Sequence, residues 1–164
     1  MTAAESTSIE HINPNGSKVT VKIGQDSSVD AKATLAEGVQ IGANSHVAPH
    51  ATLDYMVEVG NNTTIGHSAW IGSLAKVGDD TVVGVEAQIF SCSNVGDNTI
   101  IGVNAEVGAD SDVRDNVSIG ASAKLLGRVI VLSGVEIPPG WRFSSGSILK
   151  PGPRESMLVQ ERRT

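Results

Sequence analysis

Three histidines lie close together in the sequence, and their side chains are the best suited in this chain to carry out chemistry. They are His46, His50 and His67. Imidazole accepts a proton near neutral pH, so a single exposed histidine could act as a general base. Three imidazoles that converge could instead bind Zn²⁺ and leave a coordination position for water. Polar surface residues without a chemical role are the third interpretation, and the surrounding chain must decide among them.

The surrounding sequence has a short repeat, the hexapeptide. From Ile23 to Leu149 every sixth residue is apolar, which gives 22 positions out of 22. A fixed short period predicts a stacked solenoid rather than a conventional globular core. Two residues before each apolar position, from Val29 onward, stands a small or β-branched residue, with Trp141 as the one exception. The pattern predicts a narrow interior that larger and smaller side chains fill alternately.

A longer period gives the length of one coil. Asn, Asp or Gly occupies all eight positions spaced 18 residues apart from Asp26 to Gly152. These residue types adopt a left-handed backbone conformation at least cost, so one corner of each coil is expected to turn more strictly than the others. Three hexapeptides per coil predict a triangular cross-section. Seven coils at about 4.8 Å each give a prism roughly 34 Å long.

Residues 65–72 (IGHSAWIG) and 95–102 (VGDNTIIG) show the repeat most clearly. They resemble the hexapeptide-repeat superfamily. The resemblance implies an all-β, single-domain, left-handed parallel β-helix of about seven triangular coils, without inserted loops. It covers residues 19–153, between an amino-terminal cap at 1–18 and a carboxyl-terminal tail at 154–164. We expect Ile9 and Ile12 to cover the first coil, and the tail to cap the other end or to lie on a neighbouring subunit.

Composition limits the partners and the location of the protein. The 164 residues carry a formal net charge of −6, which argues against binding to a nucleic-acid backbone. The first twenty residues contain no apolar run, so neither a signal peptide nor a membrane span is expected there. The single Cys92 permits no internal disulfide, which fits a reducing, cytoplasmic location. With no histidine beside it, this thiol is not expected to act as a nucleophile.

The resemblance implies an acyltransferase-like function, although whether the protein is an enzyme at all stays open. Acyltransferases of this superfamily commonly carry a catalytic histidine after Ile-Gly, as His67 stands here. It would be the general base for a small hydroxyl or amine acceptor that attacks acetyl-coenzyme A or another acyl-coenzyme A. Backbone amides of neighbouring turns would stabilise the oxyanion. Residues 137–140 (IPPG) match the start of a motif near coenzyme A in these enzymes, whereas residues 146–149 (GSIL) depart from its second half.

A partial resemblance to γ-class carbonic anhydrases gives an alternative, a metal protein with altered zinc ligands. Residues 66–69 (GHSA) match that family's Gly-His motif, whose trimers hold the metal between subunits. The position one coil before His67 is next to His50, and His46 lies on the face that leads to this corner, so the three histidines would be the ligands. Gly72 stands where the family has a second histidine. A non-catalytic trimeric scaffold or binding protein is the third hypothesis, and the absence of loops favours it.

Two rows of apolar residues on the outside are not explained by the inward pattern, and such rows indicate interfaces. We expect a homotrimer, the usual assembly of proteins with this resemblance, to form through a first row near His67: Val82, Val85, Ile100 and Val103. A second row on another corner could receive the tail or an acyl or pantetheine chain: Tyr55, Met56, Leu74, Phe90 and Cys92. Trp70 is predicted to point outward, where it could stack on a sugar or adenine or pack in an interface.

Overall fold

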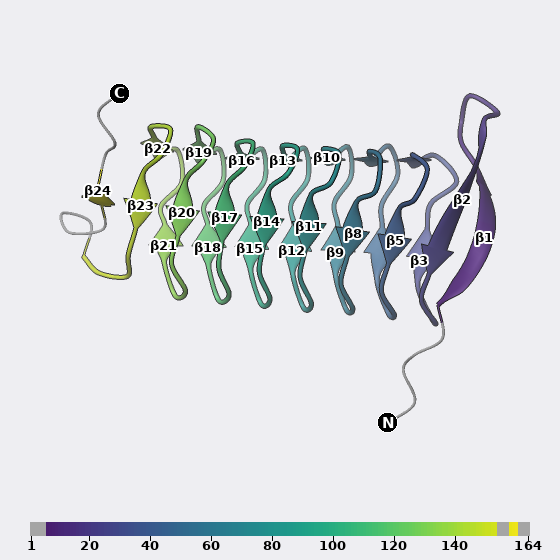
Figure 1. Cartoon of the computed structure of the whole chain (residues 1–164), viewed down its shortest axis with the longest axis horizontal. Helices are drawn as coiled ribbons and strands as arrows, with labels where there is room; N and C mark the ends of the chain where they lie inside the picture. Colours follow the sequence, from purple (N-terminus) through teal and green to yellow (C-terminus); the bar gives the residue numbers. More distant parts are fainter. Residues whose placement is uncertain (1–5, 154–157, 161–164) are drawn as a thin grey trace.

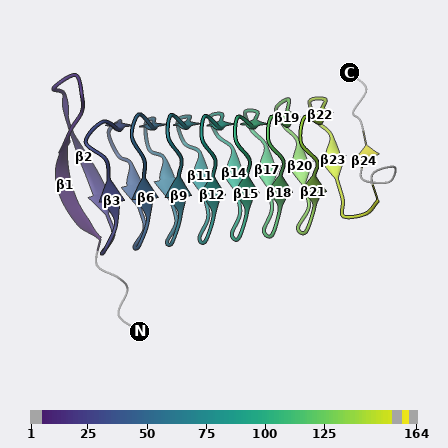
Figure 2. The same ribbon diagram turned by 180° about the vertical axis from the view of Figure 1, so that it is seen from behind.

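A computed structural model describes residues 6–153 and the backbone of residues 158–160. The chain winds into a straight three-sided prism in which short strands alternate with tight corners (Figures 1 and 2). The winding is that of a left-handed parallel β-helix of about seven coils, which confirms the predicted fold class. Among the described residues, no helix is long and apolar enough to cross a membrane.

Strands that occupy the same place in successive coils pair with each other and form three flat sheets, one on each side of the prism. Sheet A contains β1 (Thr7–Ile12), β2 (Lys18–Ile23), β5 (Gln40–Ile41), β8 (Glu58–Val59), β11 (Lys76–Val77), β14 (Asn94–Val95), β17 (Asp112–Val113), β20 (Ile130–Val131), β23 (Ile148–Leu149) and β24 (Leu158–Gln160). Sheet B contains β3 (Ser28–Val29), β6 (His46–Val47), β9 (Thr64–Ile65), β12 (Val82–Val83), β15 (Ile100–Ile101), β18 (Ser118–Ile119) and β21 (Glu136–Ile137). Sheet C contains β4 (Thr34–Leu35), β7 (Thr52–Leu53), β10 (Trp70–Ile71), β13 (Gln88–Ile89), β16 (Glu106–Val107), β19 (Lys124–Leu125) and β22 (Arg142–Phe143).

The register of this pairing places the hexapeptide apolar residues in three inward columns. In sheet B, for example, Val83 pairs with Ile65 on one side and with Ile101 on the other. All three side chains are fully buried. A column of this kind contacts the coils above and below it, so the core is continuous along the whole prism. The predicted length of one coil, three hexapeptides, is therefore confirmed.

The chain turns at three corners, which we name AB, BC and CA after the sheets that they join. The eight positions from Asp26 to Gly152 lie on the AB corner, and all eight have positive φ as expected. The other two corners have the same left-handed backbone, however, even at His50 (φ 60°) and Leu74 (φ 62°). The expectation that only one corner turns strictly is therefore wrong. The AB corner is stricter in residue type, not in conformation.

A ladder of buried hydroxyl groups runs through the interior beside the AB corner. Thr63, Thr81 and Thr99 are fully buried, and their hydroxyls donate to backbone carbonyls of the following coil at 2.7–3.2 Å. The hydroxyl oxygens of Thr63 and Thr81 also accept the backbone N–H of the residue one coil on. Because donor and acceptor are both satisfied, these polar groups cost little to bury.

The first coil is closed by a polar side chain rather than by the apolar ones that we expected. Ile9 and Ile12 are 39% and 56% exposed, so they do not cover the interior. Strand β1 instead pairs antiparallel with β2 at the edge of sheet A. The buried Asn13 closes sheet C: its Nδ2 donates to the carbonyl of Leu35 at 2.9 Å, and its Oδ1 accepts the Leu35 N–H at 2.8 Å. The amide thus replaces the missing strand next to β4.

Replacing Asn13 by leucine is expected to destabilise this end of the prism. The change leaves the backbone N–H and carbonyl of Leu35 buried without partners, and each such group costs about 1–3 kcal/mol. We therefore expect N13L to lower the free energy of unfolding by about 2–4 kcal/mol, measured by urea denaturation. Gln25→Leu is the control, because this exposed side chain makes no hydrogen bond within the described residues. A loss below about 0.5 kcal/mol for N13L would show that water replaces the amide.

At the far end the last strands of sheets A and B are finished in different ways. Strand β24 pairs antiparallel with β23, so this part of the tail caps sheet A, whereas residues 154–157 and 161–164 lie outside the described residues. In sheet B, Gly102 and Gly120 each donate their N–H to the following coil at 2.7 Å. Pro138 has the same position in the last coil, and proline has no N–H to donate. Part of the IPPG motif therefore leaves the last strand of sheet B, β21, with one fewer N–H that could pair with another strand.

Candidate functional site

His67 lies on the BC corner, on the outside of the prism and exposed to solvent. Gly66 lets the next coil approach closely at this corner: a Cβ on Gly66 would meet the backbone of Gly84 at 2.7 Å. The imidazole Nδ1 of His67 is 2.9 Å from the hydroxyl of Ser68. If Nδ1–H donates to this hydroxyl, Nε2 carries a lone pair that points to solvent and can accept a proton. Sequence reasoning missed Ser68, whose only signal was its place beside the histidine.

The structure brings two of the three histidines together. The rings of His50 and His67 are stacked edge to face on adjacent coils, with centroids 5.2 Å apart. His46 lies instead on strand β6 of sheet B, where its Nδ1 is 2.7 Å from the hydroxyl of Ser28. Among the described residues, no three His, Cys, Asp or Glu side chains are grouped so that they could hold a metal ion. The zinc alternative therefore gains no support within one chain.

The BC corner also presents backbone N–H groups without acceptors. At the AB corner, the Asn61 and Asp79 N–H groups donate to a carboxylate one coil further on, at 2.6 and 2.8 Å. On the BC corner, His67 and Val85 have the equivalent position. The residues one coil further on, Val85 and Val103, are valines and offer no carboxylate. In the described part of the chain their N–H groups have no hydrogen-bond acceptor. Because the coils repeat, the His67 N–H points toward the coil of Val85, where it can stabilise a developing negative charge.

An apolar track connects His67 with a depression at the carboxyl-terminal end of the prism. Val85, Val103 and Pro139 continue the column of His67 along the BC corner. The depression, about 740 Å³, is lined by Glu136, by residues 137–139 and by parts of the neighbouring corners. Pro139 lies four coils beyond His67, which corresponds to about 19 Å at about 4.8 Å per coil. The first apolar row, to which Val85 and Val103 belong, is exposed as expected. Each of its four side chains is at least 41% accessible to solvent.

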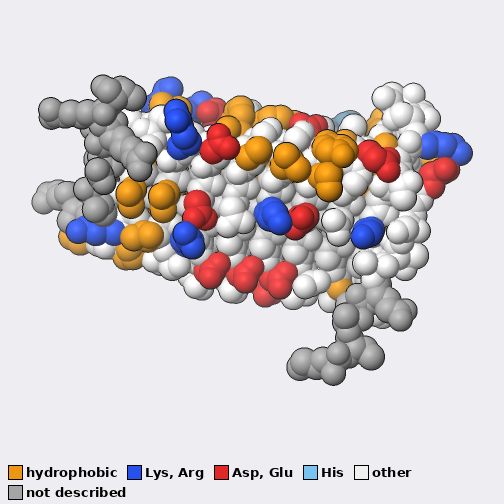
Figure 3. Space-filling model, viewed as in Figure 1, with side chains coloured by type: hydrophobic (Ala, Val, Ile, Leu, Met, Phe, Trp, Pro, Cys, Tyr) orange, Lys and Arg blue, Asp and Glu red, His pale blue; other side chains and the backbone are white. Residues whose placement is uncertain are grey.

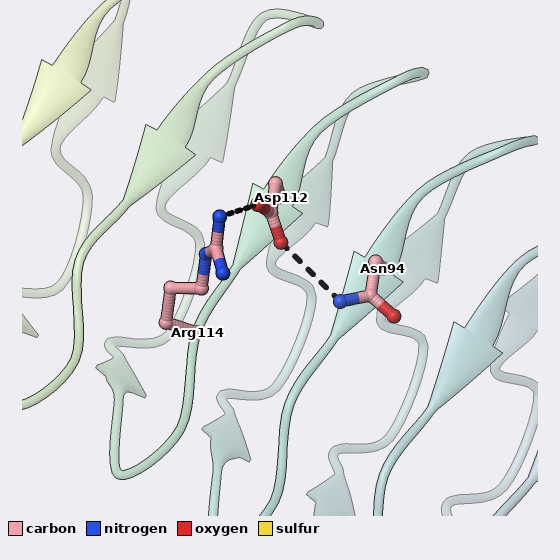
Figure 4. Close-up of polar contacts among 3 residues, drawn as sticks. All are labelled: Asn94, Asp112 and Arg114. Carbon is pink, nitrogen blue, oxygen red and sulfur yellow. Dashed lines mark hydrogen bonds and ion pairs between the residues drawn. The ribbon is translucent and has the colours of Figure 1, made fainter.

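Sheet A presents a contrasting surface, because its polar side chains interact with one another (Figure 4). Asp112 accepts a hydrogen bond from Asn94 at 3.3 Å and forms an ion pair with Arg114 at 2.7 Å. Lys76 and Glu58 form another ion pair across neighbouring strands of this sheet. Exposed pairs of this type add little stability, but they keep the surface hydrated. An apolar interface is therefore expected at sheet B rather than here.

Trp70 points outward from sheet C, as predicted from the strand alternation, and it is half-buried. Its Nε1 donates to Oδ2 of Asp54 at 3.1 Å, and its ring contacts Phe90 edge to face with centroids 5.1 Å apart. Cys92 is a free, exposed thiol. The sequence did not reveal Asp54 as a partner of Trp70. The two residues are separated by slightly less than one coil, and only the coil geometry brings them together.

Comparisons with known proteins identify the repeat and the fold. The family model "bacterial transferase hexapeptide (six repeats)" matches residues 20–54, and "hexapeptide repeat of succinyl-transferase" matches residues 94–122. No curated protein matches the sequence. A solved structure of a His-to-Ala mutant of GDP-perosamine N-acetyl transferase from Caulobacter crescentus, in complex with CoA and GDP-perosamine, is 20% identical with a TM-score of 0.52. The match covers 89% of this chain and 59% of that chain, and it supports the same fold.

A second solved structure is the acetyltransferase domain of PglB from Neisseria gonorrhoeae FA1090 in complex with acetyl coenzyme A. It is 18% identical, with a TM-score of 0.47, and the match covers 78% of this chain and 54% of that chain. This chain therefore spans less than two thirds of the length of either of these two proteins.

Proposed function

Because this chain is a hexapeptide-repeat protein whose repeats match transferase models, we propose that it is an acyltransferase. It transfers a short acyl group from a coenzyme A thioester to a small hydroxyl or amine acceptor. The observation that carries the proposal is the BC corner, where an exposed imidazole lies beside backbone N–H groups without acceptors. General-base catalysis of acyl transfer needs a group of each kind.

In the proposed reaction, Nε2 of His67 removes the proton from the acceptor as the acceptor attacks the thioester carbonyl. The carbonyl oxygen becomes negatively charged and accepts a hydrogen bond from the backbone N–H of His67. When the tetrahedral intermediate collapses, the carbon–sulfur bond breaks, and the imidazolium returns its proton to the leaving thiolate. The products are an ester or amide and free coenzyme A. Ser68 lies within hydrogen-bonding distance of Nδ1, and in the tautomer in which Nδ1–H donates to its hydroxyl, Nε2 is free to act as the base.

The apolar track gives the coenzyme a path along the prism. A pantetheine arm laid over Val85 and Val103 would lead from the depression around Pro139 to the imidazole of His67. The protein surface on this path is open, so the arm needs a second wall. A neighbouring copy packed against sheet B would supply that wall, and we propose a trimer with one such cleft at each contact.

Replacing Ile100 by aspartate should separate the subunits of this trimer. Ile100 is 53% exposed and pairs side by side with Val82 on sheet B. An unpaired carboxylate at an apolar contact carries a desolvation penalty of several kcal/mol, so we expect monomers in sedimentation velocity and loss of acyl transfer. Gln40→Glu on sheet A is the matched control, because it adds the same charge to a hydrated surface where Lys22 is its neighbour in the strand register. A stable trimer of I100D would show that the interface lies elsewhere.

The proposed function is tested by measuring thiol release from acetyl-coenzyme A against a panel of amino sugars and simple amines. Turnover with at least one acceptor is expected, together with saturable coenzyme A binding in calorimetry. The absence of both would refute the proposal and leave the non-catalytic scaffold as the better hypothesis.

A further inference from the structure

Trp70 is held in one orientation although its ring is on the surface of the prism. Asp54 of the preceding coil accepts the indole N–H, and the ring of Phe90 in the following coil packs nearly perpendicular to the indole. Fixing the ring in advance removes the entropy cost of ordering it when something binds. The indole is thus pre-organised as a flat surface.

Polar groups surround this ring on its own sheet. In the strand register, Trp70 lies between Thr52 on β7 and Gln88 on β13. With the carboxylate of Asp54, the rim offers a hydroxyl, an amide and a carboxylate oxygen around an aromatic face. On sheet C the rim of the indole is therefore polar, and a few polar groups that fix orientation around an aromatic face are typical of a small-molecule site.

The charge beside the ring disfavours phosphate-bearing ligands. Asp54 carries a negative charge next to the indole. On sheet C the first basic residue beyond Gln88 is Lys124, which already forms an ion pair with Glu106. A ligand for this surface is therefore neutral or positively charged, with one apolar face and several hydroxyls. A pyranose ring has this character, because its axial C–H groups form an apolar face and its hydroxyls lie around the edge.

We propose that Trp70, Asp54 and Phe90 form a stacking platform for a sugar ring, with Thr52 and Gln88 as hydrogen-bonding partners at its rim. The assignment of this sugar to the acceptor rests on the proposed acyl transfer. In that reaction the sugar is one unit of the acceptor molecule. Trp70 is three residues from His67, and three extended residues span about 10 Å. The platform therefore holds a part of the acceptor that is separate from the reacting group.

The apolar row on the CA corner borders the platform and continues past it. Tyr55, Met56 and Leu74 are each at least 42% exposed. The CA corner is the upper edge of the molecule in Figure 3, where hydrophobic side chains are seen. The opposite edge, at the AB corner, carries acidic side chains in the same view. Sugar binding at the platform would leave the CA row accessible, so the two surfaces can be tested separately.

Tryptophan fluorescence tests the platform directly, because the chain has only two tryptophans. In a Trp141→Phe background Trp70 is the only indole, and we expect glucosamine, N-acetylglucosamine and their disaccharides to change its emission in a saturable way. In the same background, binding followed by calorimetry should weaken at least about tenfold on Trp70→Ala and less on Trp70→Phe, which keeps a ring. Thr34→Ala, on the same sheet but two strands away, is the matched control and should bind as before.

Three results would overturn the platform. The first is no saturable response to any of these sugars. The second is a response of Trp70 to coenzyme A alone, which would assign the ring to adenine. The third is a change of sedimentation coefficient on Trp70→Ala, which would place the ring in a subunit contact. Binding is measured without turnover and can be repeated in the His67→Ala protein, so failure of the platform and failure of the acyltransferase proposal are distinguishable.

Discussion

Replacing His67 by alanine should lower kcat for acyl transfer by about 10²–10⁴-fold, the usual contribution of a general base. The acceptor then has to lose its proton to water, and no other imidazole can take over. His50 contacts the His67 ring, but it belongs to the preceding coil and lacks the Ser68 hydroxyl that orients Nδ1. Coenzyme A binding should persist, because the apolar track and the depression around Pro139 are untouched. Steady-state kinetics and calorimetry measure the two effects separately.

His46→Ala is the matched control for this substitution. His46 is also exposed, but it lies on the face of sheet B and interacts with Ser28. Its loss should change kcat by less than about twofold, since surface substitutions away from a site have small effects. Equal activity of H67A and the wild-type protein would remove the general base from the mechanism. Parallel circular dichroism spectra ensure that the comparison is made between folded proteins.

The largest stability effect is expected from the core, where Ile89→Ala should lower the free energy of unfolding by about 2–5 kcal/mol. Ile89 is fully buried and lies directly between Ile71 and Val107 in the inward column of sheet C. The coils on either side are fixed by their own backbone ladders, so the chain cannot collapse into the cavity. The full penalty for the missing atoms is then retained. Urea denaturation followed by circular dichroism gives the difference.

Gln88→Ala on the same strand is the control, because it removes a side chain of the outer face. Its effect should remain within about 0.5 kcal/mol. A loss below about 1 kcal/mol for I89A would mean that the interior relaxes around the gap, contrary to the rigid packing inferred here. Comparing the two variants therefore separates the stability contributed by the inward side chain from that of the outward side chain on the same strand.

Most of the fold could be predicted because each local rule in this chain repeats. The hexapeptide period from Ile23 to Leu149 determines the inward columns, and the longer period of one coil determines the strand pairing seen for Val83. The ends could not be predicted in this way, since they depart from the repeat. Asn13 closes sheet C through a contact with Leu35, at a separation that no period in the sequence contains.

The candidate site was predictable in position and only partly in composition. Counting back one coil correctly placed His50 beside His67, because both belong to the BC corner. It also placed His46 correctly on the face that leads to this corner, but the structure does not bring that side chain together with the other two as a third ligand. The hydrogen bonds of side chains such as Asp54 and Ser68 depend on the direction and rotamer of each side chain, and not only on its position in the repeat. Hydrogen-bond partners of this kind follow from the three-dimensional packing and are not encoded in a simple period.

The uninterrupted repeat makes this prism a molecular ruler. Since no loop interrupts the coils, the separation between the imidazole and the depression near Pro139 can change only in whole steps of about 4.8 Å. Deleting or duplicating one whole coil between Val85 and Ala121 would shift one relative to the other while leaving every local contact type in place. Under the proposed acyl transfer, the distance that a bound thioester has to span would therefore change by one coil at a time.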